Sequence, residues 1–512
     1  MYIELEWLGL MGDRGIIMSK INFKTLQAHL WKSADILRGH IDAADYKNYI
    51  FGFLFLKRLS DVFDEEVERI IRKTGDKTIA LEDRDYHDFF VPEKARWDYI
   101  KSLTHNLGDA INKANDLLEE ENPETLQGIL SAVDFNDKDK LPDNILSQLI
   151  THFSKIRLRK KDLEKPDILG DAFEYLIAQF ASSAGKKGGE FYTPKEVVEL
   201  LVEILDPKEG MRIYDPACGS GGMLIQSVYH LREQGQNQKN IALYGQEINV
   251  GTWAICKMNL LLHGLKSPQI KRCDTLRDPQ LLHSGRLMQF DIVIANPPFS
   301  LKNWGYEKAQ TDPYKRFRFG IPPKGYADYA FVQHMISTVK PKGKVGVVLP
   351  HGILFRGGAE GRIRKGILEE DLLEAVIGLP SKLFYGAGIP ACLLIINKNK
   401  PNNRRGKIFV LYGGNDYLEG KKQNKLRKED IKKVVSSYRE YKTIKKYCRP
   451  VPLSEIQKND YNLNIARYID VTEKEEKIDI QKTINEFKRL KKDCEKTENK
   501  VFSYLRELNY EV

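Results

Sequence analysis

The sequence is poor in cysteine and has no long apolar runs. Its six cysteines, among 512 residues, form no CxxC pair and no Cys/His group with metal-ligand spacing. This usage is typical of a reduced cytoplasmic protein without structural zinc or another bound metal. No apolar run reaches the roughly 18 residues that a membrane-spanning helix needs. Acidic Glu4 and Glu6 stand where a signal peptide would be basic, so no signal peptide is expected.

Two common phosphate-binding motifs are also missing. There is no Walker A motif, so ATP-driven translocation or cleavage would need another subunit. The glycine-rich turn discussed below does not have the GxGxxG spacing of a dinucleotide site. The chain has 81 basic and 71 acidic residues, a net charge of +10. This excess fits an anionic partner such as nucleic acid, although an ordinary solvated surface explains so mild an excess equally simply.

The spacing of apolar residues divides the chain into five expected parts. A second methionine, Met18, opens a stretch in which Leu26, Leu30 and Leu37 recur at helical steps. We refer to Lys155–Lys165 as the basic connector and expect a solvated linker, with DNA phosphate contact as the alternative. The expected parts are a disordered extension at 1–17, a helical amino-terminal domain at 18–165, a catalytic domain at 166–400, a basic linker region at 401–471 and a helical tail at 472–512.

Within the catalytic domain, short apolar β-branched runs alternate with helical stretches. Such alternation predicts an α/β fold, with a mostly parallel, Rossmann-like sheet and helices on both faces. Ligands of such sheets bind at the carboxyl ends of the strands. The expected strands are Met211–Tyr214, Ile241–Tyr244, Phe290–Ala295, Lys344–Leu349, Leu373–Ile377 and Ala391–Ile396.

The helical tail has a partial apolar stripe on an otherwise charged sequence. Ile484, Phe487 and Leu490 lie three residues apart, which places them on one side of a helix. Such a stripe packs against a partner helix or against the tail's own domain, and the sequence favours neither.

Three acidic residues stand at or just beyond the ends of the expected strands. Asp215 begins the string DPACGSGG between a strand and a helix, where glycines allow a ligand to approach the backbone. An acid in that turn suits a cationic amine. Glu247 can accept from both hydroxyls of a ribose, and Asp274 from an adenine amine. Each acid alone is also a plausible turn or helix-cap residue. Together, in register with strand ends, they predict a nucleoside site.

A second glycine-containing string, GGEFYTPK, precedes an apolar helix at residues 197–205. Thr193 followed by Pro194 is a good helix start, with a hydroxyl cap and a proline in the first turn. The free amides and dipole of such a helix end favour a carboxylate group of the ligand.

The strand Phe290–Ala295 ends in Asn296-Pro297-Pro298-Phe299. Two adjacent prolines make the turn rigid and leave carbonyl acceptors without amide donors. The side-chain carbonyl of Asn296 and the main-chain carbonyl of Pro297 can accept both hydrogens of a planar amine. Phe299 offers a face for a stacked base. A plain Asn-Pro turn is the alternative.

These motifs together resemble those of amino-group DNA methyltransferases, in the order of the adenine-specific class. The strings GGEFYTPKEVVELL, ADYAFVQHM and LPHGILFRGGAEGRIRK resemble the modification (M) subunit of type I restriction–modification systems, and the likeness runs from about Phe23 to Lys400. It implies an S-adenosylmethionine-dependent methyltransferase core that transfers a methyl group to the N6 amine of a flipped adenine. It also implies double-stranded DNA, a specificity (S) subunit, a second modification subunit and a restriction (R) subunit as partners.

The resemblance also assigns roles to individual residues. Asn296, Pro297 and Phe299 would bind the flipped adenine, with Pro298 in the same turn. The residues implied to hold S-adenosylmethionine are Glu190, Phe191, Tyr192, Thr193, Pro194, Lys195, Asp215, Gly219, Ser220, Gly221, Gly222, Glu247 and Asp274.

A loop at residues 303–326 alternates basic and aromatic residues at Lys315, Arg316, Phe317 and Arg318. This pattern suits phosphate contact and base stacking, and the segment Arg356–Lys365 is a second basic candidate. A surface loop with satisfied charges is the alternative for both.

The sequence leaves two other functions open. The same amine chemistry serves methyltransferases that act on glutamine amides of proteins or on cytosine amines of DNA. A scaffold that keeps the fold without turnover is the second alternative, against which the intact catalytic string argues.

Overall fold

The computed structural model describes residues 20–42, 45–183, 192–265, 267–384, 390–421, 423–471, 480–508 and 510. The chain divides into two compact units, Met1–Ile469 and Asp470–Val512. The expected extension at residues 1–17 lies outside the described residues. Among the helices that are described, none is long and apolar enough to cross a membrane.

The first unit begins with a group of helices that share one apolar core. Leu26, Leu30 and Leu37 on α1 are fully buried, as the helical spacing predicts. Asn22 caps α1 by accepting from the Thr25 amide at 2.9 Å. The expected helical amino-terminal domain is therefore confirmed. Its helices are α1 (Phe23–Leu37), α2 (Tyr46–Thr74), α3 (Lys77–Glu82), α4 (Trp97–Ser102), α5 (Leu107–Glu121), α6 (Pro123–Leu126) and α7 (Asp143–Phe153).

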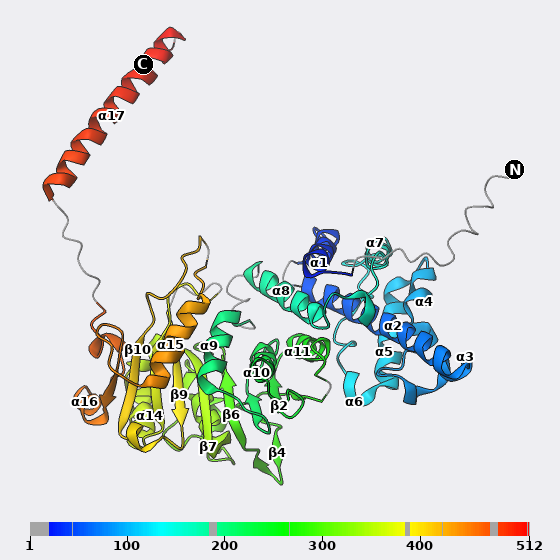
Figure 1. Cartoon of the computed structure of the whole chain (residues 1–512), viewed down its shortest axis with the longest axis horizontal. Helices are drawn as coiled ribbons and strands as arrows, with labels where there is room; N and C mark the ends of the chain where they lie inside the picture. Colours follow the sequence, from blue (N-terminus) through cyan, green and yellow to red (C-terminus); the bar gives the residue numbers. More distant parts are fainter. Residues whose placement is uncertain are drawn as a thin grey trace. The chain divides into compact units, whose positions relative to one another are not determined.

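Two later helices join this group to the sheet (Figure 1). Helix α8 (Ile168–Ser183) packs on α1 and α2, so it belongs to the helical core although it was expected in the catalytic domain. Helix α11 (Val250–Leu262) is shared between two cores. Its Ile255 packs in the helical core, whereas Cys256 packs against the sheet. An apolar helix buried on both sides ties the two halves together.

The second half of the unit is built on a nine-stranded sheet in the order β11-β10-β8-β9-β7-β6-β1-β2-β3. Strands β7, β6, β1, β2 and β3 run parallel, and β9 is inserted antiparallel between β7 and β8. All six expected strands are present. The strands are β1 (Arg212–Asp215), β2 (Ala242–Glu247), β3 (Gln269–Arg272), β6 (Phe290–Ala295), β7 (Val339–Pro350), β8 (Leu373–Gly378), β9 (Ala391–Asn397), β10 (Lys407–Tyr412) and β11 (Cys448–Pro452), with a separate hairpin of β4 (Leu282–His283) and β5 (Arg286–Leu287).

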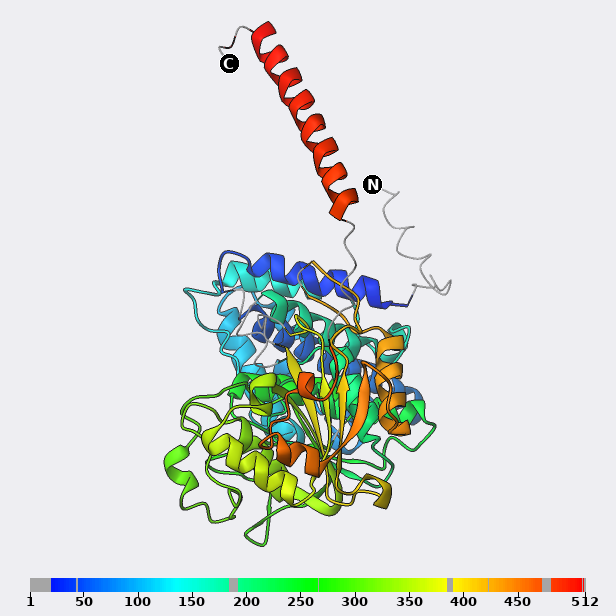
Figure 2. The same cartoon turned by 90° about the vertical axis from the view of Figure 1, so that its left-hand side faces the viewer.

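Helices cover the sheet on both faces, as the alternating pattern predicts. On one face α9, α10, α11 and α15 form a continuous apolar core with the strands. On the other face α13 contacts β6 and β7. Figures 1 and 2 show the sheet between its helices. The remaining helices are α9 (Lys195–Leu205), α10 (Gly222–Glu233), α12 (Tyr306–Ala309), α13 (Asp328–Thr338), α14 (Gly358–Glu369), α15 (Lys428–Glu440) and α16 (Leu453–Lys458).

The expected basic linker at 401–471 is wrong. Residues 407–412 form β10, which pairs in parallel with β8, and residues 448–452 form the edge strand β11. Phe409 is fully buried and stacks on Tyr441 with ring centroids 4.9 Å apart. Lysine-rich segments on both sides of this short apolar run made the region resemble a linker. Such segments are common near a sheet edge, because charge discourages further strand pairing.

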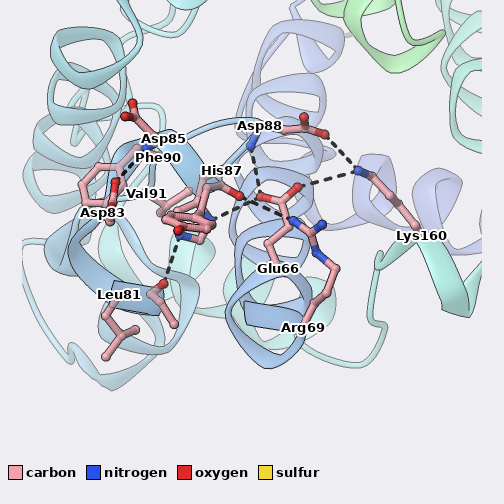
Figure 3. A network of polar contacts seen from close by, with 12 residues as sticks. Glu66, Arg69, Leu81, Asp83, Asp85, His87, Asp88, Phe90, Val91 and Lys160 are labelled. Carbon is pink, nitrogen blue, oxygen red and sulfur yellow. Dashed lines mark hydrogen bonds and ion pairs between the residues drawn. The ribbon is translucent and has the colours of Figure 1, made fainter. Parts of the chain in front are cut away.

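The basic connector docks on the helical group (Figure 3). Lys160 lies 2.9 Å from Asp88, and Arg159 lies 2.6 Å from Glu68. The Lys161 ammonium group pairs with the same Glu68 at 3.0 Å. The connector is therefore neither a free linker nor an open basic surface at these three positions, because acids of the helical group already neutralise its charge.

The second unit contains one long helix, α17 (Ile480–Glu507). The apolar side chains at Ile484, Phe487 and Leu490 are exposed, with Phe487 at 66%. The helical tail expected from the sequence is confirmed, and the described residues of its unit leave this stripe exposed.

Phe409→Ala tests whether β10 belongs to the folded core. Loss of this buried ring is expected to reduce the free energy of unfolding by about 3–5 kcal/mol. Leu418→Ala, at a side chain 56% exposed, is the matched control and should change it by less than about 0.5 kcal/mol. Denaturant unfolding measures both, and equal effects would contradict the assignment of β10 to the core.

Candidate active site

The chain reverses its progress across the sheet between β1 and β6, which are neighbours in space but distant in sequence. Loops that leave the carboxyl ends of these two strands diverge and leave an opening. Asp215 ends β1, Glu247 ends β2 and Asn296 follows β6. The structure thus brings the three predicted strand-end residues to one edge of the sheet.

Two adjoining cavities lie at this edge, and both are lined by Ala217 and Asn296. The first cavity holds the glycine turn and the start of α9. The second extends to the start of α2 in the helical group. The first is lined by Glu174, Ile177, Tyr192, Thr193, Lys195, Val198, Asp215, Cys218, Gly219, Ser220, Gly222, Met223 and Gln226. The second is lined by, among others, Asp45, Lys47, Asn48, Glu247, Ile248, Asp274, Arg277, Pro298, Leu301, Lys302 and Trp304.

The glycine turn is shaped by contacts that only glycine permits. Gly219 and Gly221 have φ of +52° and +83°, in the left-handed region. A Cβ on Gly221 would lie 3.0 Å from the Cys256 sulfur on α11. The Gly219 amide donates to Glu247 Oε2 at 3.1 Å. The turn is therefore pressed between β2 and α11, and α10 starts directly behind it.

Two carboxyl groups face the first cavity. Asp215 is 2% exposed and accepts from the Ala217 amide at 2.9 Å. Burial raises the pKa of Asp215 to about 8, and the nearby charge of Glu247 adds to the rise. Burial also raises the pKa of Glu174 on α8 to about 7, although the Lys195 ammonium group 4.0 Å away opposes it. Acids held in this way favour a cationic ligand.

Glu174 is a residue that the sequence interpretation missed. It lies on α8, and the expectation that ligands bind at strand ends does not point to a residue on this helix. The signal that would have found it is an acid on the inner face of a helix otherwise packed in apolar residues, between Leu169 and Ile177.

The acids of the second cavity also support their own turns. Glu247 Oε1 accepts from the Asn249 amide at 2.8 Å, and burial raises the pKa of Glu247. Asp274 Oδ1 accepts from the Leu276 and Arg277 amides, both at 3.0 Å. Asp274 Oδ1 therefore stabilises its own turn, as the alternative interpretation of this residue as a turn residue predicts. Its Oδ2 lies 3.5 Å from Arg277 Nη1.

A buried polar network supports the loops beneath the second cavity. Gln246 donates to the Tyr214 hydroxyl at 2.8 Å and to Thr275 Oγ1 at 2.9 Å. Thr275 in turn donates to the Pro216 carbonyl at 2.6 Å. His334 on α13 completes the network through Tyr214 at 2.9 Å. These residues connect strands β1 and β2 to the loops after β1 and β3. Sequence patterns did not identify them because their partners are distant in the chain.

Arg316 belongs to this network, so its expected role as a DNA contact is wrong. It is 3% exposed and donates to the main-chain carbonyls of Thr275 and Leu276 at 2.9 and 2.7 Å. Asp312 balances its charge at 2.8 Å. Phe317 is half-buried, with its ring centroid 5.7 Å from that of Trp304.

Lys315 and Arg318 in the same segment are exposed. Arg318 pairs with Glu370 at 2.5 Å on the surface. These two side chains remain compatible with phosphate contact.

Among the described residues, the Asn296 side chain forms a hydrogen bond through its amide nitrogen and not through its oxygen. Its Nδ2 donates to Thr193 Oγ1 at 2.9 Å. Its Oδ1 is buried and accepts no hydrogen bond from the described residues. Helix α9 starts at Lys195 with Pro194 as its cap residue, so the expected capping by Thr193 is wrong. The Thr193 hydroxyl instead orients the Asn296 amide, leaving an oxygen at the junction of the cavities.

Four further residues predicted for the site are Glu190, Phe191, Tyr192 and Phe299. Glu190 and Phe191 lie outside the described residues. Tyr192 is half-buried and packs on the helical core. The Phe299 ring is half-buried beside Phe384, with centroids 5.8 Å apart. No group of three His, Cys, Asp or Glu side chains suited to a metal ion occurs in the described part of the chain.

Known proteins match nearly the whole chain. A family model described as N-6 DNA Methylase matches residues 164–477, and one described as HsdM N-terminal domain matches residues 26–153. The MjaVII type I restriction enzyme methylase subunit of Methanocaldococcus jannaschii is 36% identical over 92% of this chain and 82% of that protein. The MjaIX methylase subunit of the same organism is 32% identical over 94% and 91%.

A solved structure agrees with these matches. The crystal structure of the type I restriction-modification system methyltransferase subunit from Streptococcus thermophilus is 30% identical to this chain. It covers 88% of this chain and 100% of its own, with a TM-score of 0.75. Sequence, fold and strand-end motifs thus agree, and the chain belongs to the N-6 DNA methylases, as a methylase subunit of the type I restriction–modification class.

Proposed function

We propose that this adenine DNA methyltransferase takes the methyl group of S-adenosylmethionine and transfers it to the N6 amine of a flipped adenine at Asn296. The observation that carries the proposal is the buried Asn296 Oδ1, which lacks a partner among the described residues and lies where both cavities meet. A buried acceptor without a donor is unfavourable, so the site is complementary to an incoming N–H group.

The two cavities fit the parts of S-adenosylmethionine. Asp215 and Glu174 in the first cavity suit its ammonium group, and Lys195 at the start of α9 suits its carboxylate. Glu247 in the second cavity suits the ribose hydroxyls. Asp274 suits the adenine amine of the cofactor. When bound, the sulfonium supplies an already activated methyl group.

The turn Asn296–Phe299, here called the catalytic turn, then has to hold the accepting nitrogen in line with that methyl group. Asn296 Oδ1 and the Pro297 carbonyl accept the two amine hydrogens, which draws the planar nitrogen toward a tetrahedral shape and frees its lone pair. Because the methyl donor is activated, positioning and hydrogen bonding suffice without a strong general base. The bond between sulfur and the methyl group would break as the new C–N bond forms, S-adenosylhomocysteine would leave, and the excess proton on the nitrogen would pass to solvent.

The target adenine must leave the duplex to reach this turn. Phe299 presents a half-buried ring for stacking, and the Phe384 ring packs against it in an edge-to-face contact. Exposed Lys302 lines the second cavity beside Pro298 and suits the phosphates that flank the extruded base.

We further propose that a specificity subunit selects the DNA sequence and that α17 packs against helices of that subunit. The exposed stripe at Ile484, Phe487 and Leu490 suits a helical partner. The resemblance to type I modification subunits also implies a second modification subunit in the assembly. A restriction subunit would supply any ATP-driven step, because no Walker A motif occurs in this chain.

Asn296→Ala tests the catalytic assignment. The chain, co-expressed with its neighbouring genes in a methylation-free host, should methylate adenine at one recognition sequence, mapped by modification-sensitive sequencing. We expect the variant to reduce methyl transfer by at least about 100-fold, because one acceptor of the amine is lost. Its affinity for S-adenosylhomocysteine should be retained.

Exposed Asn403→Ala is the matched control and should methylate normally. Unchanged methylation in Asn296→Ala would contradict the assignment. Label from the cofactor found only on protein would favour a glutamine methyltransferase, and an absence of any transfer by the wild type would favour a scaffold.

Asp215→Asn tests the assignment of the ammonium site. The variant should bind S-adenosylhomocysteine about 10- to 100-fold more weakly, because a charged hydrogen bond is lost. It should bind 5′-methylthioadenosine, which lacks the amino-acid part, as well as the wild type does. Glu203→Gln, an acid outside both cavities, is the control for isothermal titration. Equal weakening for both ligands would contradict the assignment.

The same variant has a predicted pH dependence. Because the pKa of Asp215 is about 8 in the folded chain and lower when unfolded, the wild type loses stability as pH rises toward 8. Without cofactor, Asp215→Asn should therefore melt at a higher temperature than the wild type, with a gap that widens from pH 5 to pH 8. A gap independent of pH would show that the buried charge is not responsible.

Phe487→Asp combined with Leu490→Asp tests the role of α17. Two charges in the apolar stripe should prevent co-purification with the specificity subunit, while cofactor binding by the first unit stays unchanged. The control is Lys488→Asp combined with Lys491→Asp, which adds two acidic residues to the same helix at charged positions outside the apolar stripe. Normal assembly of the first double variant would contradict the docking proposal.

A further inference from the structure

The chain leaves the catalytic turn through a strained residue that is held by a buried acid. Ser300 follows Phe299 with φ of +52°, a conformation that costs a non-glycine residue energy. Its amide donates to Asp328 Oδ1 at 3.0 Å. Asp328 is fully buried at the first position of α13. The strain is thus offset by a hydrogen bond to a carboxylate.

The second oxygen of Asp328 is held by an arginine that is itself fixed. Arg356 Nη2 donates to Asp328 Oδ2 at 2.8 Å. The same guanidinium donates to Glu360 Oε2 at 2.5 Å and Oε1 at 3.0 Å, and Glu360 is 2% exposed. Both acids lie in the first turn of their helices, α13 and α14, where the helix dipole favours negative charge. This chain of charges is the Asp328–Arg356–Glu360 clamp.

The surroundings are shaped to hold the guanidinium. A Cβ on Gly352 would lie 2.6 Å from Arg356 Nη1, so the side chain lies against bare backbone after β7. The Tyr326 ring lies 4.4 Å from the guanidinium carbon. Buried Arg364 donates to the Arg356 carbonyl at 3.0 Å. Arg356 therefore packs within the fold, which corrects its expected place in a DNA-contacting basic segment.

The catalytic turn is thus anchored at both ends. Asn296 is tied to Thr193 at its start, and Ser300 is tied to Asp328 at its end. Asp328, Arg356 and Glu360 line neither cavity. A role in contacting substrate does not fit them, whereas a role in holding the turn does.

We propose that Asp328 is a positioning residue for methyl transfer, held in place by Arg356 and Glu360. It holds the turn so that the Pro297 carbonyl and the Phe299 ring meet the flipped adenine. A displacement of about 1 Å at reacting atoms is enough to slow a reaction about 100-fold. The inference rests on the proposed role of the catalytic turn and adds a residue to it.

Asp328→Asn in the assembled complex tests this inference. Asparagine keeps the volume and an acceptor for the Ser300 amide but loses the charge that holds Arg356. The single-turnover rate and kcat should fall about 10- to 100-fold. The dissociation constant for S-adenosylhomocysteine and the KM for DNA should stay close to those of the wild type, whereas the melting temperature should fall because a buried charge pair is broken.

Asp291→Asn is the matched control, because Asp291 lies at the other end of β6 and pairs with Lys340 at 2.8 Å. An unchanged single-turnover rate in Asp328→Asn would overturn the inference, as would an equal loss in Asp291→Asn. If Asp328→Asn does not fold, Glu360→Gln decides: a several-fold loss in rate at unchanged cofactor affinity supports the clamp, and normal rate overturns it. Asn296→Ala, measured alongside, separates failure of the clamp from failure of the catalytic assignment.

Discussion

Strands β1 and β6 are neighbours, and from this pair the sheet is extended on one side by β2 and β3 and on the other by β7. The loops that follow β1 and β6 therefore lead away from each other. Everything in the active site depends on this opening at the carboxyl edge of the sheet. Asp215 and Asn296 stand on its two sides because each directly ends or follows its strand. Helix α11, buried in two cores, fixes the helical group against the same edge, and Gly251 and Thr252 near its start line the second cavity.

The catalytic turn is held rigidly, whereas buried polar groups that face the cavities are not fully compensated by the described residues. The prolines after Asn296, the Thr193 contact and the Asp328 clamp leave the catalytic turn little freedom. The Asn296 oxygen, which has no hydrogen-bond donor among the described residues, and the buried acids of the first cavity are groups whose burial is unfavourable until a donor or a cation arrives. Their unfavourable burial is tolerated because the apolar cores on both faces of the sheet stabilise the frame around them.

Sequence patterns predicted the parts of this molecule that follow a local rule. The six strands follow from alternation, and the fold confirms them. The acids follow from the position of ligands in parallel sheets: Asp215 and Glu247 do end their strands, and their role in binding stays a prediction. Strand β10 was missed because its five apolar residues lie between lysine-rich segments, which resemble a linker until the neighbouring strand is known. Arg316 was misplaced because alternating basic and aromatic residues indicate a nucleic-acid surface only when they are exposed.

The residues that could not be predicted share one property: each acts through a partner far away in the sequence. Thr193 was assigned to a helix cap by its neighbour Pro194, yet its hydroxyl serves Asn296, more than a hundred residues later. Glu174 reaches the first cavity only because α8 packs on the helical group. Local propensity cannot reveal such pairings, because their geometry exists only after the sheet and the helical core have formed. The catalytic turn consists of consecutive residues, but the residues that position it are distant in the sequence. The short motif therefore predicts the chemistry and does not reveal which residues hold the turn in place.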